Sequence, residues 1–184
     1  MSTVNVTSVK SATNLTFDTN STERARFDSS GKFGLGTNSP TAALEVVTSG
    51  GVKLLSTPLM ETAHIIAATS NSVSNIDLMD GSVKVFTTAS SGNWSHNVRG
   101  NGSTSLSSMM ATGQVAVYTL ISTLGGSSGY SNALSIDGSS QSIKWQGATP
   151  SARGGTSGYD VYTYTIIKTG SSSYIVLGQT STYS

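Results

Sequence analysis

The segment from Glu23 to Val46, ERARFDSSGKFGLGTNSPTAALEV, constrains the fold more than any other part of the chain. It contains two short runs with the alternation of a β-strand, separated by turn residues. The turn from Asp28 to Gly31 combines an aspartate, which can hydrogen-bond its own backbone, with a glycine that tolerates positive φ. A second turn sequence, GTNSP, ends at Pro40. The segment therefore predicts short strands joined by tight turns.

Two glycines in this segment interleave with apolar residues, in the order Phe33, Gly34, Leu35, Gly36. A strand edge without side chains permits very close approach of another backbone. These four residues are therefore the candidates for packing between copies of the chain.

The ordered string from Glu23 to Val46 resembles the repeated element of bacteriophage tail fibre proteins. In that element, a run of the form ER-hydrophobic-R-hydrophobic-DSSG leads into G-hydrophobic-GT-x-SP and a short apolar strand. This chain carries a single copy, which implies a short stalk. The stretch from Thr112 to Ser184 also resembles the ends of structural proteins from marine and cyanobacterial phages. Together the two resemblances imply a virion protein without defining an activity.

The first 50 residues cannot form a self-sufficient core. Burial of one Phe or Leu per strand, at about 25 cal/mol per Å², does not offset an ordering cost of ~1–2 kcal/mol per residue. We therefore predict a thin N-terminal β stalk over residues 1–50 that is stable as a homotrimer. Residues 51–184 form the predicted C-terminal β-domain, and the small residues Thr48 to Gly51 are a plausible hinge.

Longer apolar runs follow the hinge, and turn residues such as Asp80-Gly81 and Asp137-Gly138 separate them. The predicted strands are 52–55, 76–79, 83–86, 115–123, 134–136, 143–145, 161–167 and 174–177. This spacing favours an all-β fold, either a β-sandwich or a jelly roll. Helix signals are scarce. The sequence after Pro58 suits a helix or a strand, and a second short helix is a candidate over 105–110.

Two of the predicted strands are apolar on both faces. In 115–121 the valines alternate with Ala116, Tyr118 and Leu120, and in 161–167 Val161 and Ile167 lie opposite Tyr162 and Tyr164. A strand with one solvated face alternates apolar and polar residues, so these strands indicate a second covering layer or a subunit interface. The alternative is that they are central strands whose Tyr hydroxyls reach solvent.

The sequence offers little chemistry. His64 and His96 are the two histidines, and a structural role is the simpler reading of each. Asp77 and Asp80 lack the remaining ligands of a calcium loop, while Asp137 and Asp160 read as turn residues and not as a paired glycosidase acid and base. We therefore predict no enzyme activity, no cofactor and no metal.

Charge and hydropathy exclude further classes of partner. Charged residues make up 10% of the chain, against about 25% in ordinary domains, and the net charge is +1. Ser and Thr together supply about a third of the residues, which predicts a hydroxyl-rich surface. Such a chain does not attract nucleic acid, and no apolar run approaches the ~20 residues that cross a bilayer. We predict no nucleic-acid partner and no membrane insertion.

Aromatic residues in loop-like sequence are the candidates for a ligand site. Trp94 and Tyr130 lie among Gly, Ser and Asn, where exposed rings could stack on host surface glycans. Trp145 and Tyr159 are weaker candidates, and Trp145 within SIKWQG reads as a core residue.

The sequence thus predicts a non-enzymatic phage virion protein that contacts other virion proteins, as a short fibre or a capsid-decorating homotrimer. The alternative is the carbohydrate-binding receptor tip of a tail fibre. A glycan-degrading tailspike is the least supported of the three.

Overall fold

The computed structural model describes residues 8–47, 61–126, 129–152 and 154–184, and the chain divides into two units, Met1–Leu59 and Met60–Ser184. Each unit is described by itself. The predicted hinge at 48–51, the predicted strand at 52–55 and the possible helix start at 56–58 lie outside the described residues.

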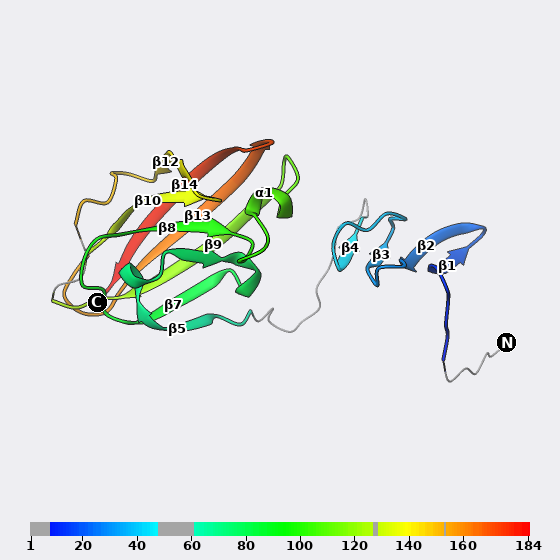
Figure 1. Cartoon of the computed structure of the whole chain (residues 1–184), viewed down its shortest axis with the longest axis horizontal. Helices are drawn as coiled ribbons and strands as arrows, with labels where there is room; N and C mark the ends of the chain where they lie inside the picture. The colour runs from blue at the N-terminus through cyan, green and yellow to red at the C-terminus, as the bar shows by residue number, and fades with distance from the viewer. Residues whose placement is uncertain (1–7, 48–60, 127–128, 153) are drawn as a thin grey trace. The chain divides into compact units, whose positions relative to one another are not determined.

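The N-terminal unit is a single four-stranded sheet in the order β1-β2-β3-β4 (Figure 1). Its strands are β1 (Leu15–Thr19), β2 (Thr22–Phe27), β3 (Phe33–Leu35) and β4 (Leu44–Val46). Asn20 and Ser21 connect β1 to β2 with φ values of 51° and 57°. Positive φ at both residues is the geometry of a two-residue hairpin turn.

The predicted turn at Asp28 to Gly31 is confirmed. Asp28 Oδ1 accepts hydrogen bonds from the amides of Ser30 (2.8 Å) and Lys32 (2.9 Å), and Gly31 adopts a φ of 79°. The aspartate therefore stabilises the turn, and the glycine supplies the left-handed backbone that follows it.

Two sheets build the C-terminal unit (Figure 1). The first has the order β11-β10-β8-β6, and the second has the order β12-β14-β13-β9-β7-β5. The strands of the first sheet are β6 (Asn75–Asp77), β8 (Trp94–Arg99), β10 (Ser131–Ile136) and β11 (Ser139–Gln141). Those of the second are β5 (His64–Thr69), β7 (Val83–Thr88), β9 (Val115–Thr123), β12 (Ile143–Trp145), β13 (Tyr159–Gly170) and β14 (Ser173–Tyr183).

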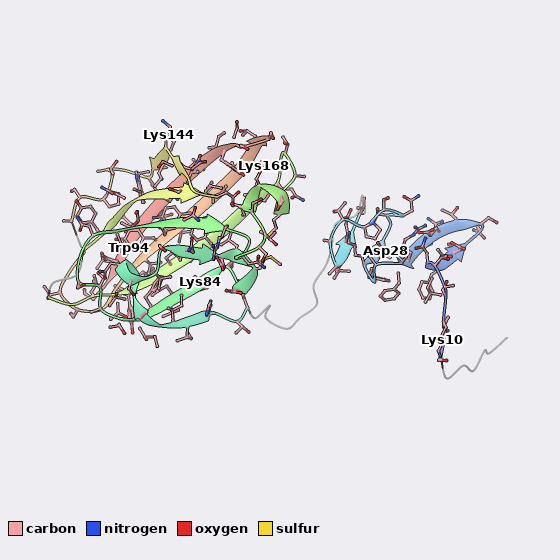
Figure 2. The ribbon with its side chains drawn as sticks, in the orientation of Figure 1. Lys10, Asp28, Lys84, Trp94, Lys144 and Lys168 are labelled. Atoms are coloured by element: carbon pink, nitrogen blue, oxygen red, sulfur yellow. The ribbon has the colours of Figure 1, made fainter. Side chains whose placement is uncertain are left out.

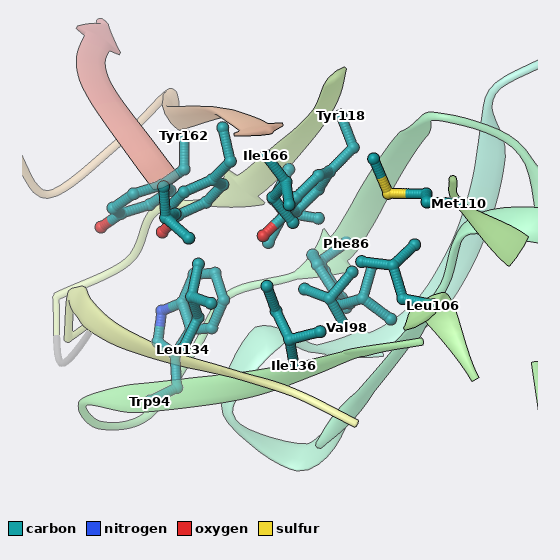
Figure 3. Packing of buried hydrophobic residues seen from close by; sticks show 14 residues of the cluster. Phe86, Trp94, Val98, Leu106, Met110, Tyr118, Leu134, Ile136, Tyr162 and Ile166 are labelled. Atoms are coloured by element: carbon teal, nitrogen blue, oxygen red, sulfur yellow. The ribbon is translucent and has the colours of Figure 1, made fainter. Parts of the chain in front are cut away.

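The hydrophobic core lies between these two sheets. One cluster joins side chains of the four-stranded sheet, such as Val98 and Ile136, to Phe86, Tyr118 and Ile166 of the six-stranded sheet (Figure 3). Both sheets mix parallel and antiparallel pairs; β9, β13 and β14 are antiparallel, whereas β7 pairs with β9 in parallel. The all-β prediction is confirmed, and the two layers form a sandwich.

Most predicted strands of this unit appear in the structure, and β9 and β12 have the predicted bounds. The prediction for 76–79 is wrong at its end, because Leu78–Asp80 forms a 3-10 turn. The segment after Pro58 takes its strand alternative in β5. The short helix predicted over 105–110 is α1 (Leu106–Met109), whose N-cap Ser105 accepts a hydrogen bond from the Ser108 amide.

Two charged side chains attach α1 to the sheets. Asp137 accepts hydrogen bonds from the amides of Leu106 (2.7 Å) and Ser107 (2.8 Å) at the start of the helix. The buried Lys168, labelled beside α1 in Figure 2, donates to the carbonyl oxygens of Ser107 (2.5 Å) and Met110 (2.8 Å). These bonds satisfy backbone groups that a helix of four residues cannot satisfy itself.

Candidate assembly surface

Eight apolar residues share one face of the N-terminal sheet. Cross-strand pairing places its residues in two rows: Leu15, Phe27, Phe33 and Leu44 in the first, and Phe17, Ala25, Leu35 and Val46 in the second. Directly paired residues, and residues two apart along one strand, lie on the same face of a sheet. We call these eight residues the apolar face.

The opposite face of the same sheet is polar. It carries Thr16, Arg26, Gly34 and Glu45, which alternate with the apolar residues along the four strands. Arg26 forms an ion pair with Glu23, with 2.5 Å between Nε and Oε1. The sheet therefore has one face suited to water and one face that requires a cover.

Nothing in the described part of the N-terminal unit covers the apolar face. Phe17, Phe27, Leu35 and Leu44 are between 44% and 63% exposed, and Ala25 is the one member that is buried. The rings of Phe27 and Phe33 contact each other, with centroids 4.8 Å apart, but no second layer lies over them among residues 8–47. While these side chains stay half-exposed, the sheet gains little burial energy to offset an ordering cost of ~1–2 kcal/mol per residue.

The four candidate packing residues do not all lie on one surface. Phe33 and Leu35 belong to the apolar face, and Gly34 lies on the polar face. A Cβ at Gly34 would lie 2.7 Å from the carbonyl oxygen of Thr37, and one at Gly36 would lie 2.0 Å from that of Val47. The close approach that the glycines predicted therefore occurs within one chain, so neither glycine requires a neighbouring copy to explain it.

Gly36 supports a prediction with a matched control. Because Gly36 has a φ of 75° and faces the Val47 carbonyl, Gly36→Ala combines backbone strain with a clash and should cost about 3 kcal/mol or more. Gly31 has a φ of 79° but open space around it, so Gly31→Ala should cost only about 1 kcal/mol. Amide hydrogen exchange of residues 33–47 measures the difference, and equal protection in the two variants would contradict it.

The structure corrects the prediction of an exposed ring at Trp94. Trp94 begins β8, is 7% exposed and packs among Phe86, His96 and Tyr162 (Figure 3). Its neighbours in the sequence resemble a loop, but the ring occupies the core. Tyr130 is half-buried in the loop before β10, and its carbonyl oxygen accepts a hydrogen bond from the Trp94 amide. The two residues therefore do not form an exposed aromatic pair.

The other aromatic candidates lie at the six-stranded sheet. Trp145 is half-buried and packs edge-on against Tyr164, with ring centroids 5.8 Å apart. The structure thus agrees with the core reading of Trp145. Tyr159 is exposed at the start of β13.

His96 belongs to a buried aromatic group. A 2.8 Å hydrogen bond joins His96 Nε2 to the Tyr118 hydroxyl, and the imidazole also packs against Tyr164. Among the described residues its Nδ1 has no hydrogen-bond partner, and the same holds for Trp94 Nε1. Burial lowers the pKa of His96 to about 3, so the ring is neutral at physiological pH. This group is enclosed by the core and has no access for a substrate.

This burial predicts acid sensitivity of the C-terminal unit. In the unfolded chain His96 titrates near 6.5, whereas its folded pKa is about 3. The unfolded state therefore binds more protons between these values, and the free energy of unfolding falls as pH falls, by about 2 kcal/mol from pH 7 to pH 5.

Urea titrations at pH 7 and pH 5 test this expectation. His96→Gln should lose that dependence, and His64→Gln, at an exposed histidine, should keep it. If the free energy of unfolding of His96→Gln fell between pH 7 and pH 5 as much as that of the wild type, His96 would not be the source of the acid sensitivity.

Asp77 and Asp160 each have local partners in the structure. Asp77 pairs with Arg99, with 2.6 Å between Nε and Oδ1. Asp160 is buried in β13, where it accepts hydrogen bonds from the Thr182 hydroxyl and the Gly154 amide. The reading of Asp160 as a turn residue is therefore wrong, while Asp137 does precede the turn glycine between β10 and β11. Within the described ranges, no three His, Asp or Glu residues lie close enough to hold a metal ion.

No family model, no curated protein and no solved structure matches this chain. In the parts of the chain that the structure describes, no helix is long and apolar enough to cross a membrane.

Proposed function

We propose that this chain is a non-enzymatic structural protein of a bacteriophage virion, a short fibre or capsid-decorating homotrimer. The single observation that carries the proposal is the uncovered apolar face of the N-terminal sheet. The resemblance of residues 23–46 to the tail fibre element supplies the virion context.

The apolar face gives the trimer a physical basis. A sheet with eight apolar residues on one side and polar residues on the other is half of a hydrophobic core. Three copies that direct this face toward a common axis enclose it completely, because each copy supplies one wall of the shared core. Burial of exposed Phe and Leu side chains stabilises such an assembly by roughly 1.5–3 kcal/mol for each fully buried side chain.

Two measurements test the proposal. Light scattering on the purified full chain at micromolar concentration should give three times the chain mass of 18.9 kDa, and a folded monomer would contradict the trimer. Electron microscopy of intact virions with an antibody against this chain should label a fixed position on the particle. Absence of label from purified virions would exclude the virion assignment.

The carbohydrate-binding tip remains the alternative function. A shallow depression of about 400 Å³ on the six-stranded sheet brings Trp145 together with Gln146, Gln179 and Thr163. An aromatic ring beside amide and hydroxyl groups is the chemistry of a sugar site. Binding of a polysaccharide to the purified chain, abolished by Trp145→Ala, would favour this alternative.

A further inference from the structure

The outer face of the six-stranded sheet lacks charged side chains on its three longest strands. Cross-strand pairing of β9, β13 and β14 places five rows of three residues on this side. The rows are Val115-Ile167-Ile175, Val117-Thr165-Leu177, Thr119-Thr163-Gln179, Ile121-Val161-Ser181 and Thr123-Tyr159-Tyr183. We call these residues the uncharged outer face.

Several of these apolar side chains have no cover within the described part of the unit. Val115, Val117, Ile175 and Leu177 are between 43% and 55% exposed. The tyrosines on the other side of β9 and β13, Tyr118, Tyr162 and Tyr164, are buried between the two sheets. Their hydroxyls therefore do not reach solvent. Central strands with solvent-exposed tyrosine hydroxyls thus do not explain why β9 and β13 are apolar on both sides.

The outer face of the four-stranded sheet provides an internal comparison. Asn75, Asp77, Asn97 and Arg99 lie in register on that side of β6 and β8. An ion pair joins Arg99 to Asp77, and a 3.0 Å hydrogen bond joins the two asparagine side chains. This is the pattern of a solvated sheet face. The two outer faces of one sandwich therefore differ in kind.

We infer that the uncharged outer face packs against other copies of the same chain, so that three copies direct it toward a common axis. The inference rests on the trimer of the proposed function and adds a second contact surface to it. Removing charged groups from water is costly even when they are paired. On this side, β9, β13 and β14 of another copy carry no charged side chain, and Lys144 of β12 lies beside them in register with Leu177. The outer face of the four-stranded sheet carries Asp77 and Arg99 in its middle.

The size of the uncharged outer face agrees with this occupant. Strands of nine to twelve residues span roughly 30–40 Å at ~3.3 Å per residue. With strands ~4.8 Å apart, the three strands of this face present on the order of 500 Å². A stable interface takes about 800 Å² from each partner, so this face supplies most of one.

Single cysteines test the inference cleanly, because the chain has no cysteine of its own. The test variants are Val117→Cys and Leu177→Cys, two conservative changes at exposed positions on different strands. The matched control is Ser95→Cys, at an exposed position on the outer side of β8. Maleimide labelling of each full-length variant is followed at micromolar concentration, normalised to the rate in denaturant, with light scattering on the same samples.

In the trimer, the thiols of Val117→Cys and Leu177→Cys should react at least about tenfold more slowly than that of Ser95→Cys, because only opening of the interface exposes them. Equal labelling rates at the three positions of a trimer would overturn this inference and leave the proposed function in place. A monomer in light scattering would overturn both. Protection that is lost when dilution dissociates the trimer comes from another copy of the chain, so the concentration dependence of the labelling rate identifies the occupant.

Discussion

Phe27→Glu should convert the assembled protein into single chains at micromolar concentration. Phe27 lies in the first row of the apolar face, between Leu15 and Phe33. In a trimer that encloses this face, each copy would bury a carboxylate without a partner, at a cost of several kcal/mol per copy. Every 1.4 kcal/mol is about tenfold in an association constant, so the three copies together remove the assembly. Light scattering measures the mass, and thermal unfolding should show that the C-terminal unit still melts cooperatively.

Thr16→Glu is the matched control for this experiment. Thr16 lies in the same sheet, in register with Arg26 on the polar face, so its new carboxylate faces water beside a guanidinium. That variant should keep the mass of the wild-type protein. If Phe27→Glu kept both this mass and the melting temperature of the wild-type assembly, the apolar face would lie outside the interface. The mass alone does not decide this, because the uncharged outer face offers a second contact between copies.

The strands and the turn of residues 23–46 could be predicted from the sequence because their signals are local, whereas β1 was not predicted. Asp28 and Gly31 determine a turn through their own side chain and backbone, and the alternation around Phe33 and Leu35 determines which residues share a face. The contact that constrains Gly36 could not be predicted in the same way. Its constraint comes from Val47, eleven positions later in the sequence. The spacing of glycines in a strand thus indicates a close approach, but not which backbone approaches.

In the C-terminal unit, sequence reasoning missed β8. Gly92, Asn93 and Ser95 around Trp94 have the composition of a loop, and this outweighed the alternation of Trp94, His96 and Val98. Those three side chains point into the core, and the residues between them face outward. A two-residue period was therefore present in WSHNVR. Polar composition alone does not exclude a strand whose outer side is solvated.

The uncharged outer face could be identified from the sequence only in part. Apolar residues on both sides of 115–121 and 161–167 were visible in the sequence, and they left a covering layer, a subunit interface and solvent-exposed Tyr hydroxyls as alternatives. The structure places the tyrosines in the core and so rejects the last. Which side of a two-sided strand faces the second sheet depends on the tertiary register of β8 and β10, which no local pattern encodes.

Trp94→Ala should cost about 3–5 kcal/mol of the free energy of unfolding, because it leaves a large cavity in the core. The Trp94 ring lies 5.3 Å from that of Tyr162 and 5.6 Å from that of His96, measured between centroids. Its loss therefore removes packing from both sheets, and the melting temperature of the C-terminal unit should fall by roughly 10–20 °C.

Tyr130→Ala is the comparison, since Tyr130 is half-buried in a loop and should cost about 1 kcal/mol or less. Calorimetry on the two variants gives the order of the effects. In a scaffold protein, any loss of host-cell adsorption by Trp94→Ala follows from unfolding and disappears below its lowered melting temperature. Were Trp94→Ala to melt like the wild type and still lose binding to host polysaccharide, the ring would have to be accessible to the ligand, and the receptor-tip function would replace the scaffold.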